Sequence, residues 1–176
     1  GRALPHVEVA ILDDQGQRCA VDVEGEICLR GPKVTKGYWN APEKTAESFF
    51  GDWFRTGDVG RLDADGFLFV TDRRKDMILT GAENVASSEI ENVIYQLPEV
   101  AEAAVIGVPD ASWGERVVAV VVPKAQCSLD LQALQTHCRA HLAGFKVPAG
   151  LEIREALPRN PSGKILKRVL RDEITG

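Results

Sequence analysis

The sequence has few of the residues that characterise secreted, membrane or nucleic-acid-binding proteins. Its four cysteines, Cys19, Cys28, Cys127 and Cys138, form no CxxC pair, which argues against a disulfide framework or a zinc site. No apolar run approaches the roughly 18 residues of a membrane span. The net charge of −5 argues against nucleic-acid binding. We therefore expect a cytoplasmic globular protein with reduced thiols, no membrane span and no nucleic-acid partner.

Several catalytic signatures are also absent. The sequence contains no GxSxG elbow, no Ser-His-Asp signature and no glycine-rich phosphate-binding loop. His137 and His141 have the i, i+4 spacing that lets two imidazoles share a metal ion, but no acidic partner segment accompanies them. We interpret them as a helical pair and predict no metal site. The chain begins at Gly1 without an initiator Met, and we expect it to be a piece of a longer protein.

The first part of the chain has the pattern of short strands. Apolar and β-branched runs alternate with turns rich in Gly, Pro and Asp, and these runs cover residues 7–12, 26–30, 53–58 and 67–70. Pro42 suits the first turn of a short helix, with Asn40 or Ala41 as its cap. We predict that residues 1–72 form the β-rich terminal subdomain of a larger domain.

The second part mixes strand and helix patterns. Continuous apolar runs, suited to a buried sheet, cover residues 103–108 and 117–122, with shorter runs at 77–79 and 151–153. Apolar residues at helical spacing predict three helices, which begin near Ser88, Ser128 and Lys164. Ser88 and Glu91 have the spacing of a capping box. We predict that residues 77–176 form a small α+β domain, so the fold class of the chain is α+β.

Residues 71–76 read Thr-Asp-Arg-Arg-Lys-Asp and lie between these two parts. A charged break between segments that are each able to pack separately is typical of a linker or hinge. An ordinary polar turn has the same composition, so composition alone leaves both interpretations open. We take residues 73–76 as a hinge between the two predicted domains.

Three side chains have a chemistry that suits ligand binding. Asp58 follows Gly57, and its carboxylate is able to accept hydrogen bonds from the two hydroxyls of a ribose. Arg73 presents a planar fork of donors for sugar hydroxyls or phosphate. Lys164 follows a loop with two prolines and stands near the start of a predicted helix, where the helix dipole opposes its charge. Each of the three also fits an ordinary solvated side chain, but Lys164 is a candidate electrostatic catalyst.

Five sequence blocks, taken together, resemble the C-terminal part of the acyl-adenylate-forming superfamily. This superfamily includes acyl-CoA synthetases, the adenylation domains of peptide synthetases, and luciferases. The blocks follow one another over essentially the whole chain: GEI, RGP, GYW and PEKT within 25–45, FRTGD at 54–58, DRRKDMI with ENV and EIE within 72–91, AVIGVPD with WGE within 104–115, and LPRNPSGK at 157–164.

The resemblance implies a reaction in two steps. Members of the superfamily make an acyl-AMP from a carboxylate and ATP, release pyrophosphate, and then pass the acyl group to a thiol. Asp58 and Arg73 match positions that bind the ribose of the adenylate, and Lys164 matches the catalytic lysine that reaches the α-phosphate and carboxylate oxygens. Lys75 matches the hinge about which a small C-terminal lid rotates between the two steps.

The same resemblance implies an acceptor site for the thiol. The candidate residues of the thiol tunnel and CoA site are Gly81, Ala82, Glu83, Trp113, Phe145 and Lys146. The chain departs from the family at Ala82, where a second Gly is common, and at Val147 and Ala149, which replace basic residues. These departures narrow the pantetheine path and leave Lys146 as the nearby cation for CoA phosphate.

We therefore expect a fragment of an AMP-forming ligase that joins a carboxylic acid, fatty or related, to CoA. ATP with Mg²⁺ and CoA are the expected cofactor and co-substrate, with ATP bound mainly by the missing upstream N-terminal domain, and the fragment alone is expected to be inactive. Two alternatives stay open: an adenylation enzyme that loads the thiol of a carrier protein, and a non-catalytic lid-like binding module. The identity of the acid is set by residues outside the sequence.

Overall fold

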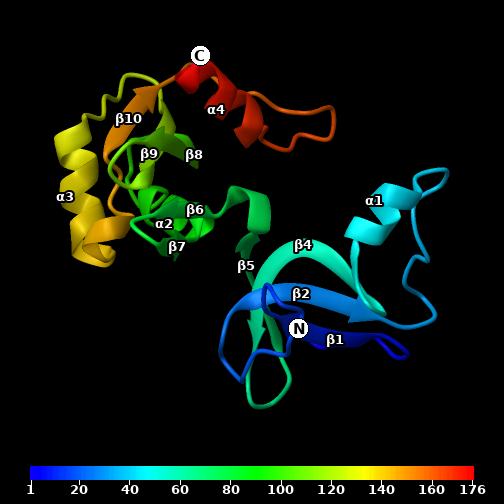
Figure 1. Ribbon diagram of the computed structural model, residues 1–176. Coiled ribbons are helices and arrows are strands. Elements are labelled where there is room, and N and C mark those ends of the chain that lie inside the picture. The colour runs from blue at the N-terminus through cyan, green and yellow to red at the C-terminus, as the bar shows by residue number, and fades with distance from the viewer. The chain divides into compact units, whose positions relative to one another are not determined.

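Two separate five-stranded sheets organise the chain, one in each half of the sequence. The computed structural model describes all of residues 1–176 and divides them into two units, Gly1–Lys75 and Asp76–Gly176 (Figure 1). The predicted α+β fold class is confirmed, since helices flank mostly antiparallel strands. None of the helices has the length and apolarity that a membrane-crossing segment requires.

The sheet of the first unit has the strand order β1-β2-β4-β3, and β5 pairs with β4. All of its pairs are antiparallel. Its elements are β1 (Glu8–Leu12), β2 (Gly25–Arg30), α1 (Pro42–Glu47), β3 (Phe49–Phe50), β4 (Trp53–Leu62) and β5 (Leu68–Arg73). The helix α1 begins as its sequence predicts, with Ala41 as N-cap and Pro42 in the first turn. Strand β4 therefore lies in the middle of the sheet and carries Asp58.

The charged stretch at residues 71–76 is only partly a break in regular structure. Strand β5 runs on to Arg73, and its last residues pair with β4 through Val59↔Asp72 and Asp58↔Arg73. The interpretation of residues 71–73 as part of a linker is therefore wrong, because pairing with β4 satisfies their backbone groups and brings opposite charges face to face. Only Arg74–Asp76 leave the sheet, as one 3-10 turn.

The sheet of the second unit has the order β10-β9-β6-β7, with β8 paired to β9. Strand β10 is parallel to β9, and the remaining pairs are antiparallel. Its elements are β6 (Ile78–Thr80), β7 (Glu83–Val85), α2 (Ser87–Ile94), β8 (Val100–Asp110), β9 (Gly114–Pro123), α3 (Leu131–His141), a 3-10 turn (Gly144–Lys146), β10 (Gly150–Ile153) and α4 (Lys167–Thr175). The hairpin β8–β9 is longer than its apolar runs indicate, since Pro109 and Asp110 still pair with β9.

The hairpin β8–β9 is buried on both faces, as its continuous apolar runs predict. Alternate residues such as Val105 and Ala119 pack with α2 and α3 on one face. Their neighbours Ile106 and Val118 pack with Leu170 of α4 on the other face. Helix α3 and helix α4 accordingly lie on opposite sides of this sheet in Figure 1.

Two predicted helix caps are wrong. The N-cap of α2 is Ala86 without a side-chain hydrogen bond, so Ser88 lies inside the helix and is not its cap. Glu91 accepts a hydrogen bond from the Val105 amide (2.8 Å) and pairs with Lys167 (2.7 Å). The cap of α3 is Asp130, which accepts from the Ala133 amide, and not Ser128. The contacts of Glu91 tie α2 to β8 and to the start of α4.

Candidate functional site

Asp58 and Arg73 face one another across neighbouring strands of the first unit. The Arg73 Nε lies 3.3 Å from the Asp58 Oδ1, and the side chains are 47% and 37% exposed. Gly57, before Asp58, has φ +75°, a conformation that side chains rarely adopt. The pair thus presents acceptors and donors side by side at the surface, which suits a ligand with adjacent hydroxyls.

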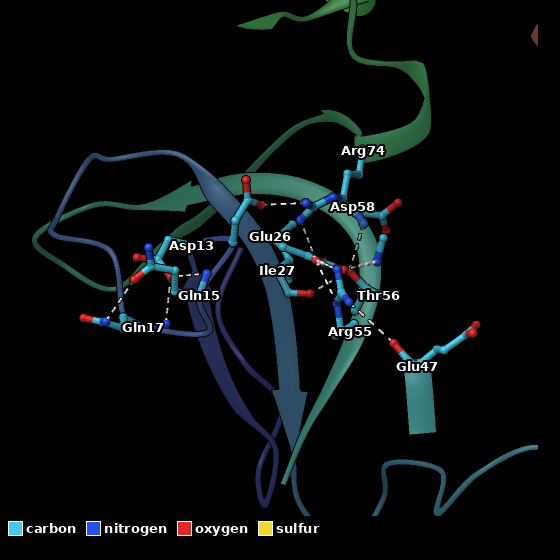
Figure 2. Close-up of polar contacts among 12 residues, drawn as sticks. Asp13, Gln15, Gln17, Glu26, Ile27, Glu47, Arg55, Thr56, Asp58 and Arg74 are labelled. Atoms are coloured by element: carbon cyan, nitrogen blue, oxygen red, sulfur yellow. Dashed lines mark hydrogen bonds and ion pairs between the residues drawn. The ribbon is translucent and has the colours of Figure 1, made fainter. Parts of the chain in front are cut away.

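A buried carboxylate, that of Glu26, contacts the backbone directly before Asp58 (Figure 2). Glu26 is only 4% exposed, and its Oε2 accepts from the Arg55 guanidinium (2.9 Å) and from Arg74 Nη1 (3.0 Å). Its Oε1 accepts from the Gly57 amide at 3.2 Å. Glu26 was not among the predicted functional residues, although a carboxylate inside the apolar run of a strand is a signal of a buried partner.

Lys75, the predicted hinge residue, is exposed in the 3-10 turn Arg74–Asp76. The residue before it is held firmly, because Arg74 Nη2 also donates to Asp14 Oδ1 at 2.5 Å. The division of the chain into two units falls directly after Lys75. Lys75 is thus the last residue of the first unit and follows an anchored arginine.

Lys164 is exposed on the loop that precedes α4, and its ammonium has no hydrogen bond or ion pair with the protein. The expectation that Lys164 begins the last helix is wrong, because α4 starts at Lys167 and the dipole argument no longer applies. The backbone of Lys164 is fixed instead by Asn160, whose Oδ1 accepts from the Lys164 amide (2.8 Å) and whose amide donates to the Lys164 carbonyl (2.9 Å).

The same loop is braced by Arg159. Its Nη1 donates to the Gly163 carbonyl at 2.5 Å, and its Nη2 lies 3.0 Å from Glu102 Oε2 on β8. An isolated bridge between Arg159 and Ile165 closes the loop at its base. The cation at Lys164 therefore stands on a fixed backbone, while its own side chain is free to approach a ligand.

A groove of about 300 Å³ opens elsewhere on the second unit. Trp113 and Phe145 line it and are 60% and 44% exposed. Arg116 on β9 lines the same groove, and no ion pair neutralises its guanidinium. The sequence analysis missed Arg116, since nothing in the sequence indicates which groove an arginine on a strand will line. The arrangement suits a flat ring and an anionic group in one ligand.

The turn at Gly81 and Ala82 borders Trp113. Gly81 donates its amide to the Trp113 carbonyl (2.9 Å), and a Cβ at Gly81 would lie 2.8 Å from the indole ring. Gly81 and Ala82 both have positive φ, at +58° and +70°, as the tight hairpin between β6 and β7 requires. Glu83 opens β7 and is exposed. The chain therefore needs glycine at position 81, and it holds Ala82 in a strained conformation.

Lys146 is not a free cation in this structure. Its ammonium contacts both carboxylate oxygens of Glu89 at 2.7 and 2.8 Å. The predicted acceptor residues thus fall into two groups. Gly81, Trp113 and Phe145 lie at or beside the groove, whereas Lys146, next to Phe145 in the sequence, is ion-paired with Glu89. Lys164 is not among the residues that line the groove.

The histidine pair on α3 has a structural partner. His137 Nε2 lies 3.0 Å from the Val93 carbonyl, and the rings of His137 and His141 are 4.9 Å apart. Within residues 1–176, no group of three or more His, Cys, Asp or Glu side chains is arranged to hold a metal ion. The contact of His137 with Val93 ties α3 to α2.

Comparison with known proteins agrees with these features. The family model "AMP-binding enzyme C-terminal domain" matches residues 89–164, and the model "AMP-binding enzyme" matches residues 1–39. The chain is 46% identical over 175 residues to the long-chain-fatty-acid–CoA ligase FadD13 of Mycobacterium tuberculosis. The aligned region covers 99% of this chain and 34% of the relative. It is 45% identical to the fatty acid–[acyl-carrier-protein] ligase ScoC of Streptomyces coeruleorubidus, over 100% of this chain and 34% of the relative.

Solved structures show the same relationship. ATP-bound MatB from Rhodopseudomonas palustris superposes with a TM-score of 0.93 at 40% identity, over 98% of this chain and 35% of that one. The chain therefore spans about a third of the length of the relatives that it matches. Sequence identity, the two family models and the superposition all point to one group of proteins, and the chain belongs to the family of AMP-binding, adenylate-forming enzymes.

Proposed function

We propose that this chain is the C-terminal part of an AMP-forming ligase that joins a carboxylic acid, fatty or related, to CoA. The similarity to a long-chain-fatty-acid–CoA ligase supports the reaction, and the similarity to an ATP-bound enzyme supports the nucleotide. The observation that carries the proposal is the free ammonium of Lys164 on its braced loop. A family member that only binds a partner has no use for a cation presented in this way.

In the first step, a carboxylate oxygen of the acid attacks the α-phosphorus of ATP, and pyrophosphate leaves as acyl-AMP forms. The Asp58 carboxylate accepts hydrogen bonds from the ribose hydroxyls, and the Arg73 guanidinium donates to the same sugar. Negative charge develops on the oxygens around phosphorus, and the compact ammonium of Lys164 stabilises it. Mg²⁺ would accompany the ATP phosphates, but residues 1–176 contain no cluster that fits it, so no step here depends on it.

In the second step, the sulfur of CoA attacks the acyl carbonyl, AMP leaves, and the thiol proton passes to solvent. The groove with Trp113 and Phe145 offers aromatic faces for the nucleotide of CoA, and Arg116 offers a cation for its phosphate. The turn of Gly81, Ala82 and Glu83 lies beside Trp113 and lines the path of the thiol. Lys146 contributes only when its contact with Glu89 opens.

The two steps need different groups from the second unit, and a hinge in the turn Arg74–Asp76, directly after the end of β5, supplies the change. In this proposal residues 1–72 belong to the large nucleotide-binding domain and residues 77–176 form the lid. The exposed position of Lys75 after the anchored Arg74 supports a pivot at this point. The division of the chain between Lys75 and Asp76 is consistent with it.

One observation supports an alternative acceptor for the acyl group. The relative ScoC is a fatty acid–[acyl-carrier-protein] ligase at nearly the same identity as the CoA ligase, so a carrier-protein thiol is the alternative acceptor. The groove of two aromatic rings and one free guanidinium favours CoA, because a carrier protein brings its own phosphopantetheine without an adenine. Supplying the full-length enzyme with ATP, a panel of acids, and either CoA or a carrier protein decides between them.

The central test is Lys164→Ala in the full-length enzyme. We expect acid-dependent pyrophosphate release to fall at least about 100-fold, the scale of losing one positioned charge stabiliser. Arg168→Ala is the matched control, since Arg168 is an exposed cation four residues further on, and it should retain the rate of the unmutated enzyme. Pyrophosphate release at the unmutated rate from Lys164→Ala would refute the assignment.

A further inference from the structure

Strand β4 bulges at the position of the candidate nucleotide site. Glu26 of β2 pairs with Val59 and Cys28 pairs with Arg55, so Thr56, Gly57 and Asp58 on β4 stand opposite one residue of β2. The backbone donors of this bulge cannot all enter the sheet's ladder of hydrogen bonds. An unsatisfied buried donor is costly, so the bulge requires other acceptors nearby.

Glu26 supplies the acceptor at the centre of the bulge. Its Oε1 takes the Gly57 amide, while the Thr56 hydroxyl accepts the Asp58 amide and itself donates to the Ile27 carbonyl (Figure 2). The carboxylate thereby takes the place of the missing strand pair directly before Asp58. The direction in which the Asp58 side chain leaves the sheet is set by these contacts.

Glu26 also holds the strand that carries Arg73. Its Oε2 accepts from Arg74, the residue directly after Arg73, and from Arg55, three residues before Asp58. One buried carboxylate therefore contacts the residue directly before Asp58 on β4 and the residue directly after Arg73, at the start of the turn that follows β5. A buried carboxylate with donors from two guanidiniums and an amide is rigid, because each of its oxygens is engaged.

We propose that Glu26 is a positioning residue for nucleotide binding, acting through Gly57 and Arg74 on the Asp58–Arg73 pair. This inference rests on the proposed function, in which that pair binds the ribose of the adenylate. Glu26 is only 4% exposed and offers almost no surface to a ligand, so its loss should weaken the binding of ATP more than the rate of the bound complex. The effect should also be specific to the nucleotide, since the site of the acid is formed by other residues.

Glu26→Gln in the full-length enzyme tests the proposal. The amide keeps the shape of the side chain but removes the charge that holds two guanidiniums and replaces one acceptor oxygen with a donor. We expect the KM for ATP to rise roughly tenfold, as for the loss of an outer-shell partner of a binding residue. The kcat and the KM for the acid should stay within about twofold of their unmutated values.

The matched control is Glu8→Gln. Glu8 pairs with Arg30 on the same sheet, but both side chains are exposed and lie away from the bulge. This variant should leave the KM for ATP unchanged.

Arg74→Met serves as a second variant, because Glu26→Gln also removes a buried charge. Arg74→Met leaves Glu26 with Arg55 and Gly57, and we expect a smaller rise in the KM for ATP, about threefold. The two effects should be less than additive in the double variant, as expected for residues in one network.

The outcomes separate this inference from the proposed function. If Asp58→Ala raises the KM for ATP while Glu26→Gln and Arg74→Met leave it unchanged, the positioning role is wrong and the nucleotide role of Asp58 stands. If Asp58→Ala leaves the KM for ATP unchanged, the nucleotide site itself is wrongly assigned. A fall in kcat with equal rises in both KM values would show a general loss of structure and would also overturn the positioning role. If Glu26→Gln does not fold, Arg74→Met decides the question alone.

Discussion

The two units of this chain are stabilised in different ways. The second unit has a buried apolar cluster on each face of its sheet, sealed by α2 and α3 on one side and by α4 on the other. The first unit has one small cluster of Ala10, Leu12 and Cys28, with Phe50 and Trp53 packed against it. It relies more on polar contacts, and its buried residues include the charged Glu26.

The first unit also exposes more large apolar side chains. Those in residues 1–75 are Leu4, Val21, Val23, Tyr38, Trp39, Phe67, Phe69 and Val70, and Trp39 is 98% exposed. Apolar side chains that lie together on an exposed surface mark a place where other protein packs. We therefore expect residues 76–176 to fold as a small domain and residues 1–75 to need further protein for stability.

The largest expected effect is seen when the units are separated. Residues 76–176 expressed alone should unfold cooperatively in urea, because both faces of their sheet are covered. Residues 1–75 expressed alone should give the amide exchange of an unfolded chain. Circular dichroism and hydrogen exchange check both fragments. A cooperative transition in the first fragment would show that its small cluster is enough.

A cavity made in the second unit should lower the stability of that unit and leave the stability of the first unit unchanged. Leu134 on α3 is fully buried, and Leu134→Ala should lower the free energy of unfolding of this unit by about 2–5 kcal/mol. Hydrogen exchange read separately from the two units should show lost protection only in residues 76–176. Thr136→Ala, on the same helix but at an exposed position, is the control and should change little. Equal losses in both units would mean that they unfold as one.

Alkaline pH should weaken the first unit. Burial raises the pKa of the Cys28 thiol from 9.0 to about 11. The unfolded chain then loses this proton at about pH 9 and the native chain only near pH 11, so stability is full below pH 9 and falls as the pH rises through this window. Cys28→Ala should flatten this fall in urea midpoints measured between about pH 9 and pH 11. A slope that is the same in Cys28→Ala would assign the fall to other groups.

The smallest effect concerns the turn beside Trp113. Ala82 has a φ of +70°, so Ala82→Gly should stabilise the second unit by about 0.5–1 kcal/mol through relief of backbone strain. Ala143→Gly is the control, since Ala143 has a φ of −62° and the change should destabilise instead. Urea unfolding of residues 76–176 measures both. Destabilisation by Ala82→Gly would show that its methyl group makes a useful contact.

The sequence predicts the parts of the fold that depend on local pattern. The hairpin β8–β9 follows from its continuous apolar runs, and α1 follows from Pro42. The cap of α2 was placed wrongly at Ser88, because the helix already begins at Ser87, directly after Ala86. The strand conformation of residues 71–73 was not predicted. Their charge alone does not show that Asp58 lies opposite Arg73 on the neighbouring strand.

Residues of the candidate site were predictable from the sequence only where they belong to a recognisable sequence motif. Asp58, Arg73 and Lys164 stand in recognisable blocks, and the pairing of Asp58 with Arg73 adds geometry to the first two. Glu26 was not predictable as a partner of Arg74, because the contact joins residues separated by 48 positions. Arg116 was missed because which groove it lines depends on the position of β9 in the sheet.

The last residue of β5 and the two residues that follow it make three different kinds of contact. Arg73 pairs with Asp58, Arg74 is bound to the buried Glu26, and Lys75 is exposed in the turn. Such close succession leaves no room for an insertion or deletion at this junction. Chimeric enzymes that exchange their second halves should therefore be joined after Lys75, so that both arginines are inherited together with the sheet that holds them.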